Sequence, residues 1–209
     1  MSKKTALWAG VMALLLVAPQ ARAAAKEWSL NFNGGIAAPV SDFKDAAKLG
    51  FMGGVGADYT VTQNVALGVD GSFVSNSGSD LTNAALSTGA GVSATGKFQL
   101  LQGGAHMKYM FPMASESSIA PYFIGGLGIY NVKGKVESSN TAFNSAYESA
   151  ASTSKVGARG GIGFNYKTSP KVSIGLESAY HWINTDVTST SFISVQAGVT
   201  VGMGTPAAN

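Results

Sequence analysis

The sequence predicts an all-β protein, an eight-stranded antiparallel up-and-down transmembrane β-barrel. Three observations predict this fold: apolar residues alternate with small or polar ones along most of the chain, turn signals divide the alternation into eight stretches, and aromatic residues gather at the stretch ends. Successive side chains of a β-strand point to opposite faces, so each stretch has one apolar face and one small or polar face. The charged residues share the glycine-rich face, which is typical of a barrel with a lipid-facing exterior and a confined polar interior.

The start of the chain predicts a secretory signal peptide over residues 1–23. Lys3 and Lys4 form a basic start, residues 6–18 are apolar, and Ala-Arg-Ala at 21–23 has the small-x-small form of a cleavage site. The apolar stretch is too short to remain as a membrane-spanning helix. Cleavage after Ala25 is the alternative.

Residues 24–209 are predicted to form one barrel domain with no net charge. The chain has 14 basic and 11 acidic residues, and Lys3, Lys4 and Arg22 lie in the leader, so the barrel domain keeps 14 − 3 = 11 basic residues against 11 acidic ones. No basic patch therefore argues for a nucleic-acid partner. The absence of cysteine excludes disulfides and thiolate chemistry.

The predicted strands follow the alternation in chain order. In the first, Trp28 and Phe32 face lipid while Asn31 and Asn33 face inward. A short turn of helix is predicted at 41–45, in the first long connection. The strands are predicted over residues 28–37, 51–59, 65–73, 97–111, 119–132, 156–166, 172–182 and 191–203.

Two strands depart from simple alternation. In the fourth, Phe98 and Leu100 share one face and Met107 has the opposite parity, so we expect a β-bulge at Leu100 and Leu101. The fifth strand allows two facings. We favour the one that places Phe123, Leu127 and Ile129 toward lipid over the one that places Tyr122, Ile124 and Tyr130 there.

The connections alternate between long and short, which with an even strand number predicts both termini in the periplasm and the long loops outside the cell. The loops at 75–96 and 133–154 are rich in polar residues and are predicted to be mobile. Exposed loops often carry binding function. Phe143 and Tyr147, four residues apart in the second loop, indicate a short helix, an exposed contact point for a ligand, or incidental aromatics in a mobile loop.

The aromatic residues predict two girdles, one at each membrane interface. The periplasmic girdle is predicted to contain Trp28, Tyr59, Tyr109, Phe111 and Tyr166. The outer girdle is predicted to contain Phe51, Phe73, Phe98, Trp182 and Phe192.

The interior is predicted to hold a polar plug, structural or gating, centred on an ion pair between Arg159 and Glu177. An eight-stranded barrel is just wide enough for its own side chains to fill, and charges buried there must be paired. The inward ionisable residues are Asp58, Asp70, His106, Lys108, Arg159, Glu177 and His181.

Three segments of the sequence resemble recurring motifs of the small eight-stranded outer-membrane β-barrels, the OmpX/OmpA-like domain. They are Gly-Gly-Ile-Ala-Ala-Pro-Val-Ser-Asp-Phe at 34–43, Gly-Val-Gly-Ala-Asp-Tyr at 54–59 and Pro-Tyr-Phe-Ile-Gly-Gly-Leu-Gly at 121–128. The resemblance implies the outer membrane of a Gram-negative bacterium, contact with its lipid and lipopolysaccharide, and handling by the secretion and barrel-assembly machinery. The chain departs from the family pattern at its last strand, which ends Val-Gly-Met at 201–203 where relatives commonly end on an aromatic residue.

The expected function is non-enzymatic: envelope structure, or interaction with a surface ligand through the long loops. A narrow-channel porin is the alternative, and a lipid A-modifying enzyme is less favoured. Lipid A-modifying enzymes that resemble serine hydrolases need a His and a Ser exposed to lipid. In this sequence His106 and His181 both fall on the inner face. No catalytic set, metal or cofactor is predicted. A soluble lipocalin-type barrel would have the opposite pattern, with an apolar interior and a charged exterior.

Overall fold

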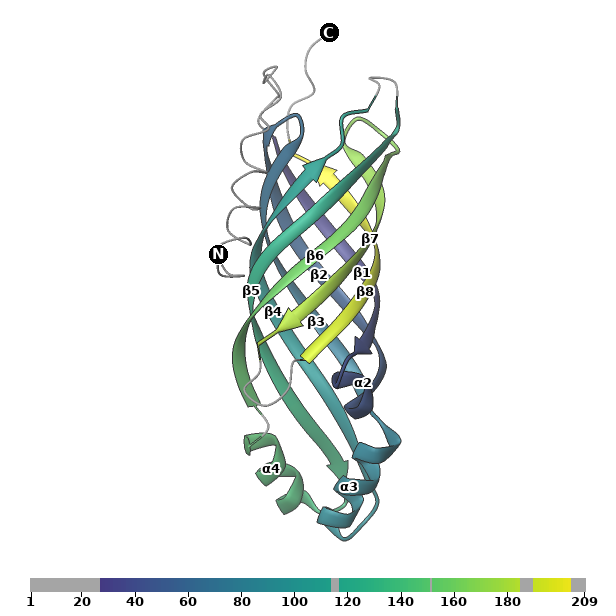
Figure 1. The fold of residues 1–209 in the computed structure, drawn as a ribbon, viewed down its shortest axis with the longest axis vertical. Helices are drawn as coiled ribbons and strands as arrows, with labels where there is room; N and C mark the ends of the chain where they lie inside the picture. Colours follow the sequence, from purple (N-terminus) through teal and green to yellow (C-terminus); the bar gives the residue numbers. More distant parts are fainter. Residues whose placement is uncertain (1–26, 114–116, 151, 185–189, 204–209) are drawn as a thin grey trace, which may run out of the picture.

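The eight strands close into a single antiparallel barrel, as the sequence predicts (Figure 1). The structure is a computed structural model, and it describes residues 27–113, 117–150, 152–184 and 190–203. The predicted signal peptide lies outside the described residues. No helix among these residues is both long and apolar enough to cross a membrane.

Three short helices interrupt the strand order on one side of the barrel. The elements are β1 (Trp28–Val40), α2 (Phe43–Ala46), β2 (Ala47–Thr62), β3 (Val65–Gly78), α3 (Asp80–Ala90), β4 (Ala94–Met110), β5 (Ile119–Ser138), α4 (Thr141–Ala150), β6 (Ser152–Lys167), β7 (Val172–Ile183) and β8 (Thr190–Gly202). The predicted helical turn at 41–45 corresponds to α2.

Closure comes from the pairing of the first strand with the last. β1 pairs with β8 from Ser29 opposite Gly202 to Val40 opposite Ser191, and every other strand pairs with its sequence neighbours. Over the described residues that pair on both sides, the closed wall has no free strand edge, so its backbone donors and acceptors are satisfied without water.

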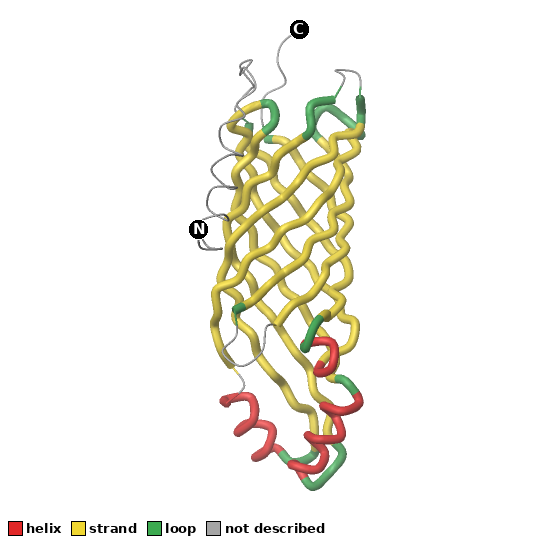
Figure 2. The backbone as a smooth tube through the Cα atoms, viewed as in Figure 1, coloured by secondary structure: helices red, strands yellow, loops and turns green. Residues whose placement is uncertain are grey.

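The two ends of the barrel differ. Tight turns lie at one end, where Asn64 Nδ2 donates to the carbonyl of Met110 (2.8 Å) and so ties the β2–β3 turn to the end of β4. All three helices lie at the other end, and there β4 and β5 extend past the rest of the wall (Figure 2). We call α3, α4 and the projecting ends of β4 and β5 the extracellular lobe, because the sequence analysis predicts that the long connections lie outside the cell.

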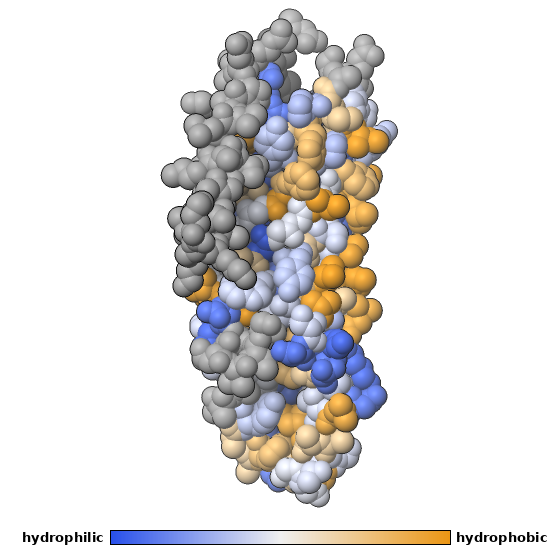
Figure 3. Space-filling model, viewed as in Figure 1, coloured by the Kyte–Doolittle hydropathy of each residue, from blue (hydrophilic) through white to orange (hydrophobic). Residues whose placement is uncertain are grey.

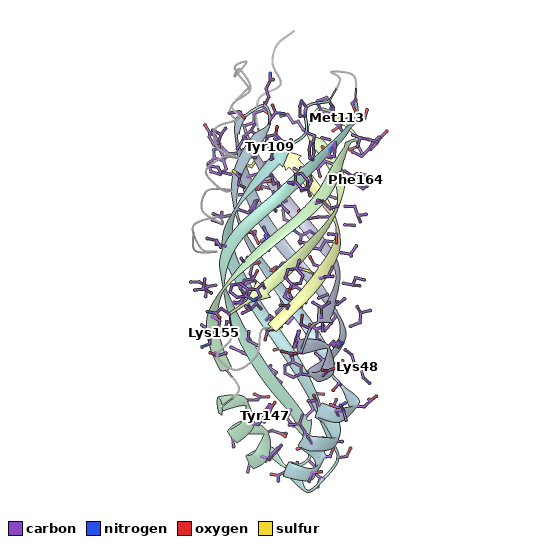
Figure 4. All side chains as sticks on the ribbon, viewed as in Figure 1. Lys48, Tyr109, Met113, Tyr147, Lys155 and Phe164 are labelled. Atoms are coloured by element: carbon purple, nitrogen blue, oxygen red, sulfur yellow. The ribbon has the colours of Figure 1, made fainter. Side chains whose placement is uncertain are left out.

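Apolar residues gather on the visible outer wall between these ends, most clearly on the right of the view (Figure 3). Phe164 points away from the barrel (Figure 4), and Val55 is 56% exposed. On β5, Leu127 is 69% exposed whereas Tyr130 is 1% exposed, so the favoured facing of this strand is confirmed. The same alternation continues through the remaining strands.

The predicted bulge in β4 is wrong. Leu100 pairs with Val74 and Leu101 with Phe73, in a register that runs without a shift. Leu100 is fully buried and Phe98 packs beside it inside the barrel, so Phe98 does not belong to the outer girdle. The parity change in the sequence has a different cause: this end of the interior is filled by apolar side chains.

The outward placement predicted for Phe192 is also wrong. Its side chain is 1% exposed and its ring stacks on His181, with centroids 4.2 Å apart and planes at 8°. Ile193 faces outward at 39% exposure, and strict alternation then requires Phe192 to face inward.

The loops predicted at 75–96 and 133–154 contain regular structure. β3 and β4 project into the first and enclose α3, which begins where Ser79 Oγ accepts from the backbone N–H of Thr82 (3.2 Å). Gly91 ends α3 in the left-handed conformation at φ 69°, which favours glycine. The second loop contains α4.

The interior position of Phe192 predicts a large packing loss on truncation. Phe192→Ala is expected to lower the free energy of unfolding by about 3–5 kcal/mol, because the space it leaves is enclosed. Phe51→Ala is the control: Phe51 is 62% exposed on the outer wall, where lipid tails fill the space that the ring leaves. Urea unfolding in lipid vesicles measures both, and equal losses would contradict the interior placement.

Candidate functional site: the barrel interior

An ionic cluster of five side chains fills the middle of the barrel. It consists of Asp58 from β2, Asp70 from β3, His106 and Lys108 from β4, and Arg159 from β6. His106 lies at its centre, with Nε2 2.7 Å from Asp58 Oδ1 and Nδ1 2.8 Å from Asp70 Oδ1. One imidazole therefore bridges two carboxylates across three strands.

Each carboxylate also has a permanent cation. Lys108 Nζ donates to Asp58 Oδ2 (2.7 Å) and Arg159 Nη2 donates to Asp70 Oδ1 (2.7 Å). The five side chains are between 3% and 13% exposed. Buried charges are tolerated when they are paired and hydrogen-bonded, and this cluster meets both conditions.

Small residues on the inner face make room for the cluster. Gly68 lies between Asp58 and His106 in the register of β2, β3 and β4. A Cβ atom at position 68 would lie 2.6 Å from His106 Nε2, closer than non-bonded atoms approach. Glycine at position 68 is thus a packing requirement of the ionic cluster.

The predicted ion pair between Arg159 and Glu177 is wrong. Arg159 lies opposite His181, and Glu177 lies opposite Gly163, four positions further along the hairpin. Glu177 accepts a hydrogen bond from Tyr122 Oη (2.9 Å), and no ion pair in the described part of the chain joins it to Arg159. The centre of the plug is His106. The registers of β2, β3 and β4 align Asp58, Gly68 and His106, and the register shift between Thr60 and Thr62 prevents this alignment from being counted back from the turn.

His181 belongs to a second interior group. Its side chain is 1% exposed, its Nδ1 lies 3.1 Å from Tyr130 Oη, and its Nε2 lies 3.1 Å from Ser194 Oγ. The sequence analysis placed His181 on the inner face but did not pair it with Ser194, which lies on the neighbouring strand β8. The contact is enclosed in the barrel, and a phenol stands where a hydrolase would place a carboxylate.

An apolar layer closes the interior on the side of the helices. Phe43 of α2 reaches into the barrel mouth and packs edge-on against Phe98, with ring centroids 5.6 Å apart. The layer contains Ala37, Phe43, Ala47, Met52, Val74, Leu100, Tyr130, Ile183 and Phe192. The sequence analysis assigned the inner face to polar residues and so missed this layer.

A small polar cavity lies on the opposite side of the ionic cluster. Its volume is about 50 Å³, and its lining includes Asn31, Asn33, Lys108, Tyr122 and Glu177. Asn31 Nδ2 and Asn33 Oδ1 are buried without a protein partner. A cavity of this size and polarity has room for water, which would supply the missing hydrogen bonds.

The predicted girdle residues other than Phe98 and Phe192 lie on the outer wall. At the end with the tight turns, Trp28 packs on Tyr59 (centroids 5.0 Å apart) and Phe111 packs on both Tyr109 (5.8 Å) and Phe123 (4.9 Å). Tyr166 is 45% exposed there. The outward aromatics toward the other end are Phe51, Phe73, Tyr180 and Trp182.

Phe143 and Tyr147 lie on α4 and pack into the extracellular lobe (Figure 4 labels Tyr147). Their rings are 6.3 Å apart and both are half-buried. They pack against an apolar group of Leu86, Ala90, Ala94 and Val136. The short-helix interpretation holds, and these aromatics attach α4 to the lobe.

The ionic cluster predicts that two interior carboxylates, Asp70 and Glu177, contribute differently to the stability of the barrel. Asp70→Asn is expected to lower the free energy of unfolding by about 3–5 kcal/mol, because it leaves Arg159 buried without its counter-charge. Glu177→Gln is expected to lower the free energy of unfolding by about 1 kcal/mol or less, since the glutamine side chain still accepts the hydrogen bond from Tyr122. Unfolding by urea in the same vesicles gives both values. If Glu177→Gln is the more damaging change, the cluster is assigned wrongly.

The fold is shared with known membrane barrels. The crystal structure of Neisserial surface protein A (NspA) is similar, with 18% identity and a TM-score of 0.59 over 83% of this chain and 96% of that one. A major outer membrane protein from Thermus thermophilus is similar at 12% identity and a TM-score of 0.54, over 86% of this chain and 100% of that one. At these identities the likeness concerns the fold alone.

The sequence comparison identifies the family. No curated protein matches the sequence significantly. The sequence model of the family described as "Outer membrane protein beta-barrel domain" matches residues 9–201, which is most of the chain. The resemblance noted from the sequence is thereby confirmed, and the chain belongs to the outer membrane protein β-barrel domain family.

Proposed function

We propose that the protein is a non-enzymatic, non-conducting barrel that presents its extracellular lobe at the surface of a Gram-negative outer membrane, as a structural or surface-interaction protein. On this proposal a cleavable signal peptide directs its export. The single observation that carries the proposal is the closure of the interior by two stacked barriers, the apolar layer and the ionic cluster.

The two barriers oppose ion passage in different ways. An ion entering from the lobe side meets Phe43, Leu100 and Phe192, which offer no polar atom to replace its water shell. An ion entering from the other side reaches the cavity and then the ionic cluster, where it must break short ion pairs. The small polar cavity is the one feature among the described residues that favours a narrow channel. Lys108 of the ionic cluster forms part of its lining, so the cluster lies between this cavity and the apolar layer.

The extracellular lobe supports a surface role. α3 and α4 pack through the apolar group of Leu86, Ala90, Ala94 and Val136, which gives the lobe a small core of its own. Leu81 on α3 is 76% exposed and takes no part in that core. An ordered lobe with exposed apolar residues is suited to contact a partner, because little chain entropy remains to be lost on binding.

The enclosed His181–Ser194 contact argues against catalysis on lipid. Both side chains are buried inside the barrel, so a lipid acyl ester in the membrane has no access to Ser194 Oγ. The contact has a packing role: Ser194 Oγ also donates to the carbonyl of Ala179 (3.3 Å).

The closed interior predicts an absence of conductance. The protein inserted into a planar lipid bilayer is expected to give no discrete current steps, and Glu177→Gln is expected to behave in the same way. Heat-modifiable migration on a detergent gel checks that the inserted protein is folded. Reproducible cation-selective steps that Glu177→Gln abolishes would instead establish a channel through the polar cavity.

The buried serine predicts unchanged lipid A. Cells with and without the protein are expected to have the same lipid A acyl pattern by mass spectrometry. The Ser194→Ala variant serves as the control. A pattern that changes with the wild type and reverts with Ser194→Ala would show that the protein is an enzyme.

A further inference from the structure

The outward face changes from apolar to polar at one level of the barrel wall. The change falls on four adjacent strands, β3 to β6, just before they enter the extracellular lobe. The last apolar residue and the first polar one on each strand are Phe73 and Ser75, Leu101 and Gln99, Ile129 and Asn131, and Val156 and Ser154. Ser75 is opposite Gln99, and Asn131 is opposite Ser154, so the polar residues are neighbours in the sheet. This line marks the outer limit of the lipid-facing wall.

Three lysines on β4 and β5 follow this line on the same outward face. Lys133 lies four residues beyond Ile129, and Lys97 lies four residues beyond Leu101; Lys135 is opposite Lys97. Four residues of a strand tilted by about 40° rise roughly 10 Å along the membrane normal. The headgroup region begins at the edge of the hydrocarbon core, and a lysine side chain is long enough to reach back into it.

The described residues give this lysine group fewer ion pairs than it has charges: Glu137 pairs with Lys97, and Glu148 lines the groove beside the other two without an ion pair to either. Lys97 and Lys135 occupy directly opposite positions, where like charges are destabilising. Glu137 is 2.6 Å from Lys97 but is 65% exposed. Neither Lys133 nor Lys135 has an ion pair among the described residues. By contrast Lys48, also on the lobe side, has its own acid, Asp80, at 2.6 Å.

Protection of a strand edge does not explain the group. Beyond Lys133 the outer edge of β5 is not paired with β6, and lysines on such edges discourage unwanted strand pairing. Protection of the strand edge explains the presence of Lys135. It does not fit Lys97, which is paired with Ser77 on one side and Lys135 on the other, or Lys133, which is paired with both Gln99 and Ser152.

We infer that Lys97, Lys133 and Lys135 bind the phosphate groups of a phosphorylated lipid headgroup in the outer leaflet. Phosphate supplies the missing negative charge, and lysine binds it as a point charge. A polar groove beside β5, lined by Ser145, Glu148 and Ser152 as well as both β5 lysines, lies next to the site and accepts the polar part of a headgroup. The inference rests on the outer-membrane location and orientation of the proposed function.

The test is lipid retention by the full chain in detergent micelles, measured by native mass spectrometry. The probes are diphosphoryl lipid A, the same lipid after enzymatic removal of its phosphates, and inorganic phosphate as a competitor. We expect the Lys133→Gln/Lys135→Gln variant to retain diphosphoryl lipid A about 25-fold less than wild type, since each lysine near an anionic surface contributes about a factor of five. The dephosphorylated lipid is expected to bind both proteins equally weakly.

Lys167→Gln/Lys171→Gln is the matched control, because it removes two exposed lysines at the opposite end of the barrel. It is expected to retain the lipid as wild type does. The lipid site would be overturned if the β5 variant and wild type retained diphosphoryl lipid A equally, if wild type retained the dephosphorylated lipid as well as diphosphoryl lipid A, or if an equimolar amount of inorganic phosphate displaced the lipid. Heat-modifiable migration confirms that each variant is folded. Outer-membrane fractionation separately tests the proposed function, so failure of one is distinguishable from failure of the other.

Discussion

The constraint on which the rest of the structure depends is the neutralisation of charge inside a closed eight-stranded wall. A barrel of this size has room for its own side chains and little else, so every interior charge must find a partner within one layer of side chains. His106 solves this problem by bridging Asp58 and Asp70, and Lys108 and Arg159 complete the pairing from two further positions. Glycine at position 68 follows from the same constraint, because a side chain there would displace His106.

The interior is layered along the barrel. A small polar cavity lies toward the tight turns, the ionic cluster occupies the middle, and the apolar layer lies on the side of the helices. Phe43 links this interior to the surface, because it belongs to α2 and yet is a core residue. The extracellular lobe is thus built on a closed, rigid support.

Most of the wall could be predicted from the sequence, since the lipid and the interior impose opposite chemistry on alternate residues. That rule located every strand and the facing of β5. It failed at Phe98 and Phe192, because aromatic residues serve both as girdle and as interior filling. It also failed to pair Arg159 correctly: Asp70 is its partner across the barrel, and such contacts between non-adjacent strands leave no periodic signal in the sequence. The helices of the lobe depend on capping residues such as Ser79 and on packing that a polar composition conceals.

The central claim is that Arg159 is held by Asp70 inside a closed interior. Solid-state NMR of the protein in lipid bilayers tests it most directly, through the ¹⁵N–¹³C dipolar coupling between the guanidinium nitrogens of Arg159 and the side-chain carboxyl carbon of Asp70. We expect a strong coupling, together with guanidinium protons that exchange slowly with D₂O. A coupling to Glu177 instead, or exchange at the rate of a free arginine, would contradict the closed interior.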